Sequence, residues 1–237
     1  MLVLVSSSPA AKTDLDRLND LVSALGAAAD DAARAQLVTT FLHDVAYGDG
    51  GFPIRANGKL AVVWWDPQKT PGSLALAGDH DAWNVSAEPL SQPVARFPFY
   101  YRVEDDPMPA SRSLYKFVRG GSEFLPDPWA RRYGFDPNGE YSLLEAGTAQ
   151  GHLERWPSFD QSIGSLEPRT LITWVPPNYD STKAPYLPLL VMQDGQNLFG
   201  PGGAYGSWHA DDAAEQGVES GDVRARQRRF GSYAHRA

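Results

Sequence analysis

Apolar side chains recur at helical spacing near the start of the chain. Four of them follow one another every three or four positions, which predicts an amphipathic helix: Leu15, Leu18, Val22 and Leu25. Thr13, followed three residues later by Asp16, is typical of a capping box, in which each side chain bonds the backbone N–H of the other residue. The pattern therefore predicts a helix that begins at Thr13 and ends near Gly26.

A second helix is expected after Gly26, and it should end in the glycine-rich stretch at 48–51. Its apolar face is predicted to consist of Ala33, Leu37, Phe41 and Val45. We expect this N-terminal helical segment, residues 1–50, to be a pair of helices packed on the domain that follows. The alternative is a separate helical hairpin that binds a partner.

Between about residue 60 and residue 147 the pattern changes to short alternating or apolar runs separated by Pro, Gly and Asp. These runs predict strands at 61–65, 73–79, 97–103 and 114–118. Several short strands with turn residues between them favour a β-sandwich over residues 51–150. Trp64 and Trp65 are neighbours on one predicted strand and point to opposite faces, so we expect at most one of them in the core.

Two further strands are predicted in the last third of the chain, after a linker at 151–165. Residues 169–175 alternate apolar and polar side chains before a Pro-Pro turn. Residues 187–192 (LPLLVM) are apolar and end before Asp194 and Gly195, which is typical of an inner strand of a parallel sheet, buried on both faces. We expect Gly195 to allow a tight turn, and Asp211 with Asp212 to begin a helix.

The residues around this second strand resemble a family of enzymes. D-G-Q-N-L-F at 194–199, then Trp208, then the acidic helix start, occur in an order similar to the esterase family of α/β-hydrolases typified by enterochelin (siderophore) esterases and esterase D. The resemblance covers roughly residues 166–224. It implies a mixed fold, in which N-terminal helices and a β-sandwich precede the first strands and helix of an α/β-hydrolase domain.

The resemblance also implies an activity, the hydrolysis of a small-molecule carboxylic ester by a serine nucleophile through a covalent acyl enzyme. Family members carry that serine in a G-x-S-x-G turn, followed by an acid and a histidine. The 237 residues contain no G-x-S-x-G, so no catalytic residue is assigned and we expect this chain to be inactive, without any cofactor. The matching loop would supply an oxyanion-hole donor, the N–H of Gln196, with Gly195 permitting its geometry. Trp208 and His209 are expected at the substrate cleft.

The preceding module carries a second resemblance. L-A-G-D-x-x-x-W-N at 76–84, Y-K-F-V at 115–118 and P-D-P-W-A-R-R-Y at 126–133 are similar to early-set immunoglobulin-like domains related to glycogen-binding modules. A domain of this kind precedes the catalytic domain in enterochelin-type esterases. Trp64, Trp65 and Trp129 are accordingly candidates for stacking on a glycan, with packing of the core or between domains as the alternative.

Charge and composition limit the partners, the location and the metal sites that can be expected of the protein. The formal net charge of −8 argues against nucleic acid as the main partner. No apolar segment reaches the length of about 18 residues needed to span a membrane, so we expect a cytoplasmic protein. The chain has no cysteine, and His80, His152 and His209 lack zinc-ligand spacing, so no metal site is expected. The sequence does not indicate an oligomeric state.

The last residues differ in composition from the rest of the chain. Residues 225–237 contain several arginines and no acidic side chain. We expect a frameshift or a truncation near Arg224, which would leave this tail out of frame or disordered. The alternative is a functional basic tail that binds an acidic surface or a nucleic acid.

Overall fold

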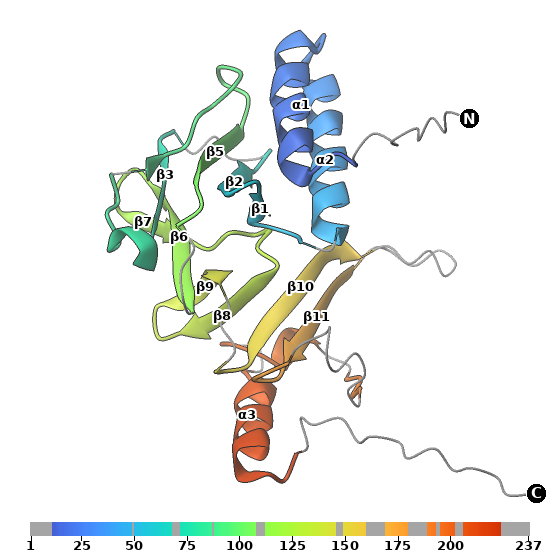
Figure 1. Ribbon diagram of the computed structural model, residues 1–237, viewed down its shortest axis with the longest axis vertical. Helices are drawn as coiled ribbons and strands as arrows, with labels where there is room; N and C mark the ends of the chain where they lie inside the picture. Colours follow the sequence, from blue (N-terminus) through green and yellow to red (C-terminus); the bar gives the residue numbers. More distant parts are fainter. Residues whose placement is uncertain are drawn as a thin grey trace, which may run out of the picture. The chain divides into compact units, whose positions relative to one another are not determined.

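The chain forms two compact units that are built from helices and from mostly antiparallel sheets (Figure 1). Unit 1 comprises Met1–Met108 with Lys116–Arg131, and unit 2 comprises Pro109–Tyr115 with Arg132–Ala237. The computed structural model describes residues 11–48, 50–67, 72–86, 88–107, 112–145, 149–159, 169–179, 189–192, 195–201 and 206–223. The expected basic tail at 225–237 lies outside these residues.

Two helices open unit 1, as the sequence predicts: α1 (Asp14–Ala27) and α2 (Asp31–Tyr47). The capping box is confirmed, because Thr13 N donates to Asp16 Oδ2 at 2.9 Å and Asp16 N donates to Thr13 Oγ1 at 3.1 Å. Asp30 caps α2 by accepting a hydrogen bond from Ala33 N at 2.8 Å. Both helices therefore begin at side chains that satisfy N–H groups left free by the first turn.

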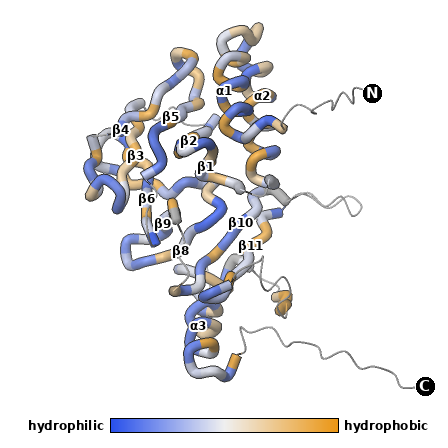
Figure 2. The backbone as a smooth tube through the Cα atoms, in the orientation of Figure 1, coloured by the Kyte–Doolittle hydropathy of each residue, from blue (hydrophilic) through white to orange (hydrophobic). Residues whose placement is uncertain are grey.

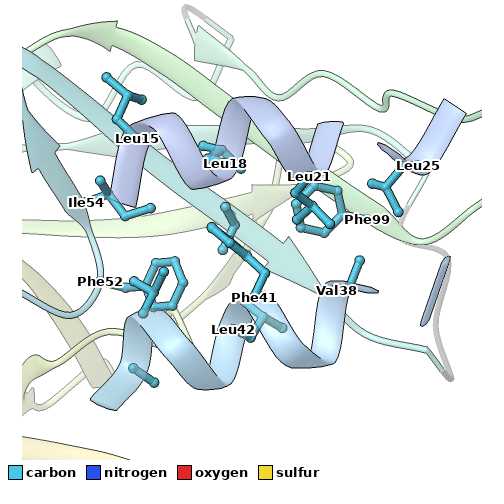
Figure 3. Packing of buried hydrophobic residues seen from close by; sticks show 14 of the residues in the cluster. Leu15, Leu18, Leu21, Leu25, Val38, Phe41, Leu42, Phe52, Ile54 and Phe99 are labelled. Carbon is cyan, nitrogen blue, oxygen red and sulfur yellow. The ribbon is translucent and has the colours of Figure 1, made fainter. Parts of the chain in front are cut away.

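The two helices bury one continuous apolar face, but the face of α2 differs from the prediction (Figure 3). Ala33 and Leu37 are exposed, and the buried side chains are Val38, Phe41, Leu42, Val45 and Ala46. A row of residues at i, i+4, i+8 advances by about 40° at each step around a helix of 3.6 residues per turn. Phe41 and Val45 of the predicted row therefore lie within the buried stripe, whereas Leu37 and Ala33, nearer the start of α2, lie outside it. On α1 the buried residues are Leu15, Leu18, Leu21 and Leu25, with Val22 partly buried.

The helices pack against a three-stranded antiparallel sheet of β1 (Ile54–Ala56), β2 (Lys59–Trp65) and β5 (Phe99–Asp105), in the order β1-β2-β5. Ala61 and Val63 of β2 belong to the same core cluster as the leucines of α1 and α2. The expectation that the helical pair packs on the following domain is therefore confirmed.

Strand β2 is buried on both of its faces. Trp65 is partly buried against the helical core, where its ring centroid lies 5.1 Å from that of Phe97. On the opposite face Trp64 is buried, and its ring meets the ring of Phe117 edge to face at 5.3 Å. The expectation that at most one of these tryptophans lies in the core is thus confirmed, because Trp64 is buried whereas Trp65 is only partly buried against the helical core.

The rest of unit 1 consists of β3 (Leu74–Gly78), the 3-10 turn η1 (Asp79–Asp81), β4 (Glu88–Pro89), residues 116–119 of β6 (Ser113–Arg119) and β7 (Glu123–Leu125). Strands β6, β3 and β4 are neighbours in that order, and β7 pairs with β6. The four strands predicted by alternation correspond to β2, β3, β5 and β6. Strands β1, β4 and β7 were missed because runs of two or three residues are too short to show a period.

The end of α2 is tied to the segment that precedes unit 2. The guanidinium of Arg131 donates to the carbonyl of Gly48 at 3.1 Å, and Arg131 N donates to Phe52 O at 2.8 Å. Gly51 has a φ of 64°, and a Cβ there would lie 2.9 Å from Cβ of Arg131. Glycine at position 51 therefore satisfies both a left-handed backbone and a close side-chain approach.

Unit 2 is built on β8 (Arg132–Asp136), β9 (Gly139–Glu145), β10 (His152–Phe159) and β11 (Arg169–Val175), followed by the 3-10 turn η2 (Gly195–Asn197) and helix α3 (Ala210–Ser220). The strand order is β11-β10-β8-β9, and β9 pairs antiparallel with residues 113–115 of β6. The strand predicted at 169–175 is confirmed. Residues 152–159, expected within a linker, instead form β10, which pairs with both β8 and β11.

The expected inner strand at 187–192 differs most from its prediction. Residues 189–192 have no strand structure, and Leu189, Leu190 and Val191 are about four-fifths exposed, at 82%, 80% and 79%. An inner parallel strand needs partners on both edges and cover on both faces. No strand within the described residues pairs with this segment, so its apolar side chains remain in water.

The described residues contain three α-helices and two sheets, so the mixed helix and sheet class is confirmed at this level. Helix α3 is mostly hydrophilic and has no buried residue (Figure 2). In the described part of the chain, none of the helices combines the length and the apolar character required to cross a membrane.

Two leucines of α2 provide a test of the core assignment. Leu42 is fully buried at 0% exposure, whereas Leu37, five residues earlier, is 37% exposed. We expect Leu42→Ala to lower the free energy of unfolding by about 2–5 kcal/mol and the matched control Leu37→Ala to change it by less than about 0.5 kcal/mol. Urea denaturation followed by circular dichroism measures both, and equal effects of the two changes would contradict this assignment.

Candidate functional site

The turn η2 holds the part of the D-G-Q-N motif that the structure describes. Two backbone hydrogen bonds join it to the segment before α3, from Trp208 N to Asn197 O at 2.7 Å and from Ala210 N to Leu198 O at 2.9 Å. Leu198 is buried beneath the turn. The backbone of η2, including Gln196, is therefore held against residues 206–210, whereas Asp194 lies outside the described residues.

The two glycines near this turn have different roles. A Cβ on Gly195 would meet no atom within 4 Å, so the space around this residue does not require the glycine that we expected to be needed there. Gly200 has a φ of 64°, and a Cβ there would clash with the ring of Phe135 on β8. Close packing near this loop therefore depends on Gly200.

Asn197 carries a polar atom that the described residues do not satisfy. Its side chain is buried, and its Oδ1 has no hydrogen-bond partner among them. A buried amide oxygen without a donor costs free energy of about 1–3 kcal/mol. A bound molecule or a further segment of protein with an N–H or O–H group would recover that cost.

Helix α3 begins at the residues that the sequence assigns to a cleft. Asp211 and Asp212 lie in its first turn, as predicted. His209 stands at the N-cap with a φ of 50°, its side chain does not cap the helix, and its Nδ1 lies 3.1 Å from Asp212 Oδ2. Trp208 is exposed. Trp208 and His209 are thus accessible at the start of α3, next to the turn that they were expected to accompany.

Asp211 is the least satisfied carboxylate of this region. Burial raises the pKa of Asp211, and the neighbouring charge of Asp212 acts in the same direction. Its Oδ1 has no hydrogen-bond partner among the described residues. Burial also raises the pKa of Tyr133 on β8, and the charge of Asp211 contributes to that increase. Asp211 therefore lies within electrostatic reach of β8.

Glu215 attaches α3 to strand β10. Its two carboxylate oxygens accept hydrogen bonds from Gly151 N at 3.0 and 3.2 Å. A Cβ on Gly151 would lie 2.5 Å from Glu215 Oε2 and 2.7 Å from Trp174 Nε1. Glycine at position 151 lets the helix carboxylate and the indole of β11 approach the backbone together.

His152 and Glu154, considered as metal ligands or an acid–base pair from the sequence, form an ion-pair cluster on β10. Glu154 Oε1 lies 3.2 Å from His152 Nε2 and also accepts from Arg132 Nε at 3.2 Å. Burial alone would raise the pKa of Glu154, but the hydrogen bond with His152 and the charge of Arg132 outweigh burial and lower the pKa below its ordinary value. The described residues place no third metal-ligand side chain at this cluster.

The turn after β3 presents an aromatic pair. Asp81 Oδ1 accepts a hydrogen bond from Gly78 N at 2.9 Å, which closes the turn η1. Trp83 has a φ of 60°, and its Nε1 donates to Asp79 Oδ1 at 2.8 Å. The Trp83 ring lies 6.1 Å from the ring of Phe124, a residue of β7 that is exposed.

The tryptophans nominated for a glycan do not form one surface. Trp64 is buried against Phe117, and Trp65 with Trp129 packs on the helical core. Trp208 belongs to unit 2. Trp83, which is partly exposed, instead contacts the exposed ring of Phe124 in unit 1. The pairing of β7 with β6 positions Phe124, and this pairing joins strands too short to show a period in the sequence.

One group of possible metal ligands comes together in unit 1. His80, Glu88 and Glu104 each offer one ligand atom, and these atoms lie within 4.8 Å of one another. The described residues contain no other group of three or more such side chains. Sequence spacing missed this group because its members belong to η1, β4 and β5.

The chain matches no protein-family model and no curated protein.

The lowered pKa of Glu154 predicts a pH dependence of stability. A carboxyl group whose pKa is lower in the folded than in the unfolded protein stabilises the fold above the unfolded pKa, and this stabilisation is lost as the pH falls through the folded pKa. We therefore expect stability to decrease below pH 4.5, the ordinary pKa of the group. Glu154→Gln should lower the free energy of unfolding at neutral pH by about 1–3 kcal/mol and flatten this decrease. Denaturation curves for both proteins that run parallel from about pH 7 to about pH 3 would contradict the assignment.

Proposed function

We propose that the chain is the N-terminal part of a serine carboxylic-ester hydrolase of the enterochelin-esterase type, and that these 237 residues alone are inactive. The observation that carries the proposal is the D-G-Q-N turn, held by two backbone hydrogen bonds to a Trp-His segment that begins an acidic helix. In α/β-hydrolases the loop after this strand contributes a backbone N–H to the oxyanion hole. Gln196 N–H is the proposed donor.

The arrangement of the preceding residues supports the same proposal. Strands β10 and β11 form an antiparallel pair directly before the motif, which fits the early strands of such a domain. Ahead of them, unit 1 packs a three-stranded sheet through Trp64 onto Phe117 of a second sheet, as in a β-sandwich. We propose that this sandwich is an early-set immunoglobulin-like domain and that the motif residues start an α/β-hydrolase domain.

The exposed run at 189–192 fits this proposal as well. Its apolar side chains have the composition of an inner strand, yet they lie in water. Further strands of a parallel sheet would cover them and would carry the G-x-S-x-G serine, the acid and the histidine. The substrate of the intact enzyme would be a small-molecule ester, attacked by serine to form an acyl enzyme.

The proposal predicts that the purified chain does not hydrolyse esters. Incubation with p-nitrophenyl butyrate should give the rate of buffer alone, and a serine-reactive phosphonate should label no residue, because the serine elbow is absent from the sequence. Hydrolysis that the phosphonate abolishes would contradict the prediction.

The matched control is a chain extended from the encoding DNA. Translation of every frame past codon 224 should reveal an apolar strand followed by G-x-S-x-G, and a protein carrying that extension should gain phosphonate-sensitive hydrolysis. DNA that encodes no G-x-S-x-G turn in any frame would overturn the proposal that the chain is part of an esterase.

Glycan binding by unit 1 is the second candidate function, and the contact between partly exposed Trp83 and exposed Phe124 favours it. Aromatic faces stack on sugar rings, and nearby carboxylate and amide groups can bond the hydroxyls. Asp79 orients the indole of Trp83, and Asn84 follows it in the chain. This pair replaces Trp64, Trp65 and Trp129 as the proposed contact surface, because Trp64 is buried and the other two rings pack against the helical core.

Affinity electrophoresis in a gel containing soluble glucan tests this second function. The wild-type chain should be retarded, and Trp83→Ala should lose most of the retardation because the stacking face is removed. Trp208→Ala is the matched control, since it removes an exposed indole from unit 2 and should leave mobility unchanged. Absence of retardation for the wild type, or equal retardation for Trp83→Ala, would exclude glycan binding at this pair.

A further inference from the structure

A partly buried cluster of one imidazole and two carboxylates lies in unit 1. His80 lies in η1, Glu88 in β4 and Glu104 in β5. Pairing of Leu76 with Glu88 places β4 beside β3, whose end continues into η1. A bridge between Ser91 and Tyr101 then brings the residues after β4 to β5. Three elements thus deliver one ligand side chain each to the same place.

The geometry of the cluster suits a metal ion. His80 Nε2 lies 3.0 Å from Glu88 Oε2, and one ligand atom of each of the three residues lies within 4.8 Å of the others. Zinc binds nitrogen and oxygen ligands at about 2.0–2.2 Å, which puts two ligands of one ion about 3–3.6 Å apart. Small rotations of the carboxylates would bring all three atoms to those separations.

Burial distinguishes this cluster from an exposed acidic patch. The side chains of His80, Glu88 and Glu104 are 4%, 16% and 14% exposed. His80 Nδ1 is buried and has no hydrogen-bond partner among the described residues. An imidazole buried with one unpaired nitrogen costs free energy. Because Nε2 is the nitrogen that faces Glu88, an ion bound there would leave Nδ1 unpaired, so the site rests on the burial of the cluster and on its mixed nitrogen and oxygen donors.

Arg102 occupies the place between the two carboxylates. It lies two residues before Glu104 on β5, so both side chains project from one face of the strand. Its Nε donates to Glu104 Oε2 at 2.5 Å and lies 3.9 Å from Glu88 Oε2. With a neutral His80, the two carboxylates and Arg102 carry a net charge of −1. The arginine therefore neutralises the cluster only in part.

We propose that His80, Glu88 and Glu104 form a binding site for a divalent transition-metal ion, with Zn²⁺ as the best fit, and that the guanidinium of Arg102 competes with the ion for Glu104. Imidazole together with carboxylate is a donor set that suits zinc, whereas calcium and magnesium take oxygen ligands. Three protein ligands leave a fourth position for water, as in zinc sites that are open to a substrate. The ion would replace the Arg102 bond, and the guanidinium would turn toward Pro89 O, to which its Nη1 already donates at 3.3 Å.

Zinc titration of the full chain against a chromophoric chelator tests the proposal. The wild type should bind one tightly held Zn²⁺ per chain, and Co²⁺ should produce visible absorption typical of nitrogen and oxygen ligation. Glu104→Gln should weaken binding by about tenfold or more, because a charged ligand is lost. Arg102→Gln should tighten binding by about tenfold, because the competing cation is removed and the net charge of the cluster becomes −2.

His209→Ala is the matched control, because it removes an exposed histidine that also lies beside a carboxylate, Asp212. It should leave stoichiometry and affinity unchanged. If Glu104→Gln fails to fold, Arg102→Gln decides the question, since Zn²⁺ should raise the melting temperature of this variant more than that of the wild type. Wild-type protein that binds no Zn²⁺, or an Arg102→Gln variant that binds it no more tightly, would overturn the proposal and leave the cluster as an ion-pair network.

Discussion

The burial of β2 on both faces is the constraint on which unit 1 depends. Ala61 and Val63 face the helical pair, and Trp64 on the other side meets Phe117 of β6. Each large apolar side chain removed from water in this way contributes about 1.5–3 kcal/mol. Because β2 takes part in both contacts, the helices and the two sheets are packed together through this one strand. The turn after β3, with its aromatic pair and its ligand cluster, is built on this core.

Unit 2 is organised differently, by polar contacts to the backbone. The carboxylate of Glu215 holds α3 to Gly151, and two backbone hydrogen bonds hold η2 to the residues before that helix. Helix α3 has no buried residue, so these contacts replace the apolar packing that fixes α1 and α2. The exposed run at 189–192 belongs to the same region. Within the described residues, these hydrogen bonds therefore hold η2 and α3 in place.

Buried polar atoms without partners mark the regions to which functions are proposed. Asn197 Oδ1 and Asp211 Oδ1 lie next to the esterase motif, and His80 Nδ1 lies in the ligand cluster. Folding leaves such atoms unpaired only at a cost. Trp64 Nε1 likewise has no partner among the described residues, although it is buried against Phe117 and no function is proposed for it. An unpaired atom is therefore no evidence for a site by itself, and the carboxylates around His80 carry the proposal made there.

The sequence by itself determined the features that depend on interactions between residues close together in the chain. The Thr13 capping box, both N-terminal helices, five of the strands (β2, β3, β5, β6 and β11) and the start of α3 follow from patterns within a few residues, and these predictions are confirmed. Tertiary structure alone decided which stripe of α2 is buried, that the residues expected in a linker form β10, and that 189–192 is exposed. Those outcomes depend on which element packs against each face, and the spacing of apolar residues along the sequence does not identify that element. The cluster of His80, Glu88 and Glu104 depends likewise on the register of three separate elements, which only the folded chain brings together.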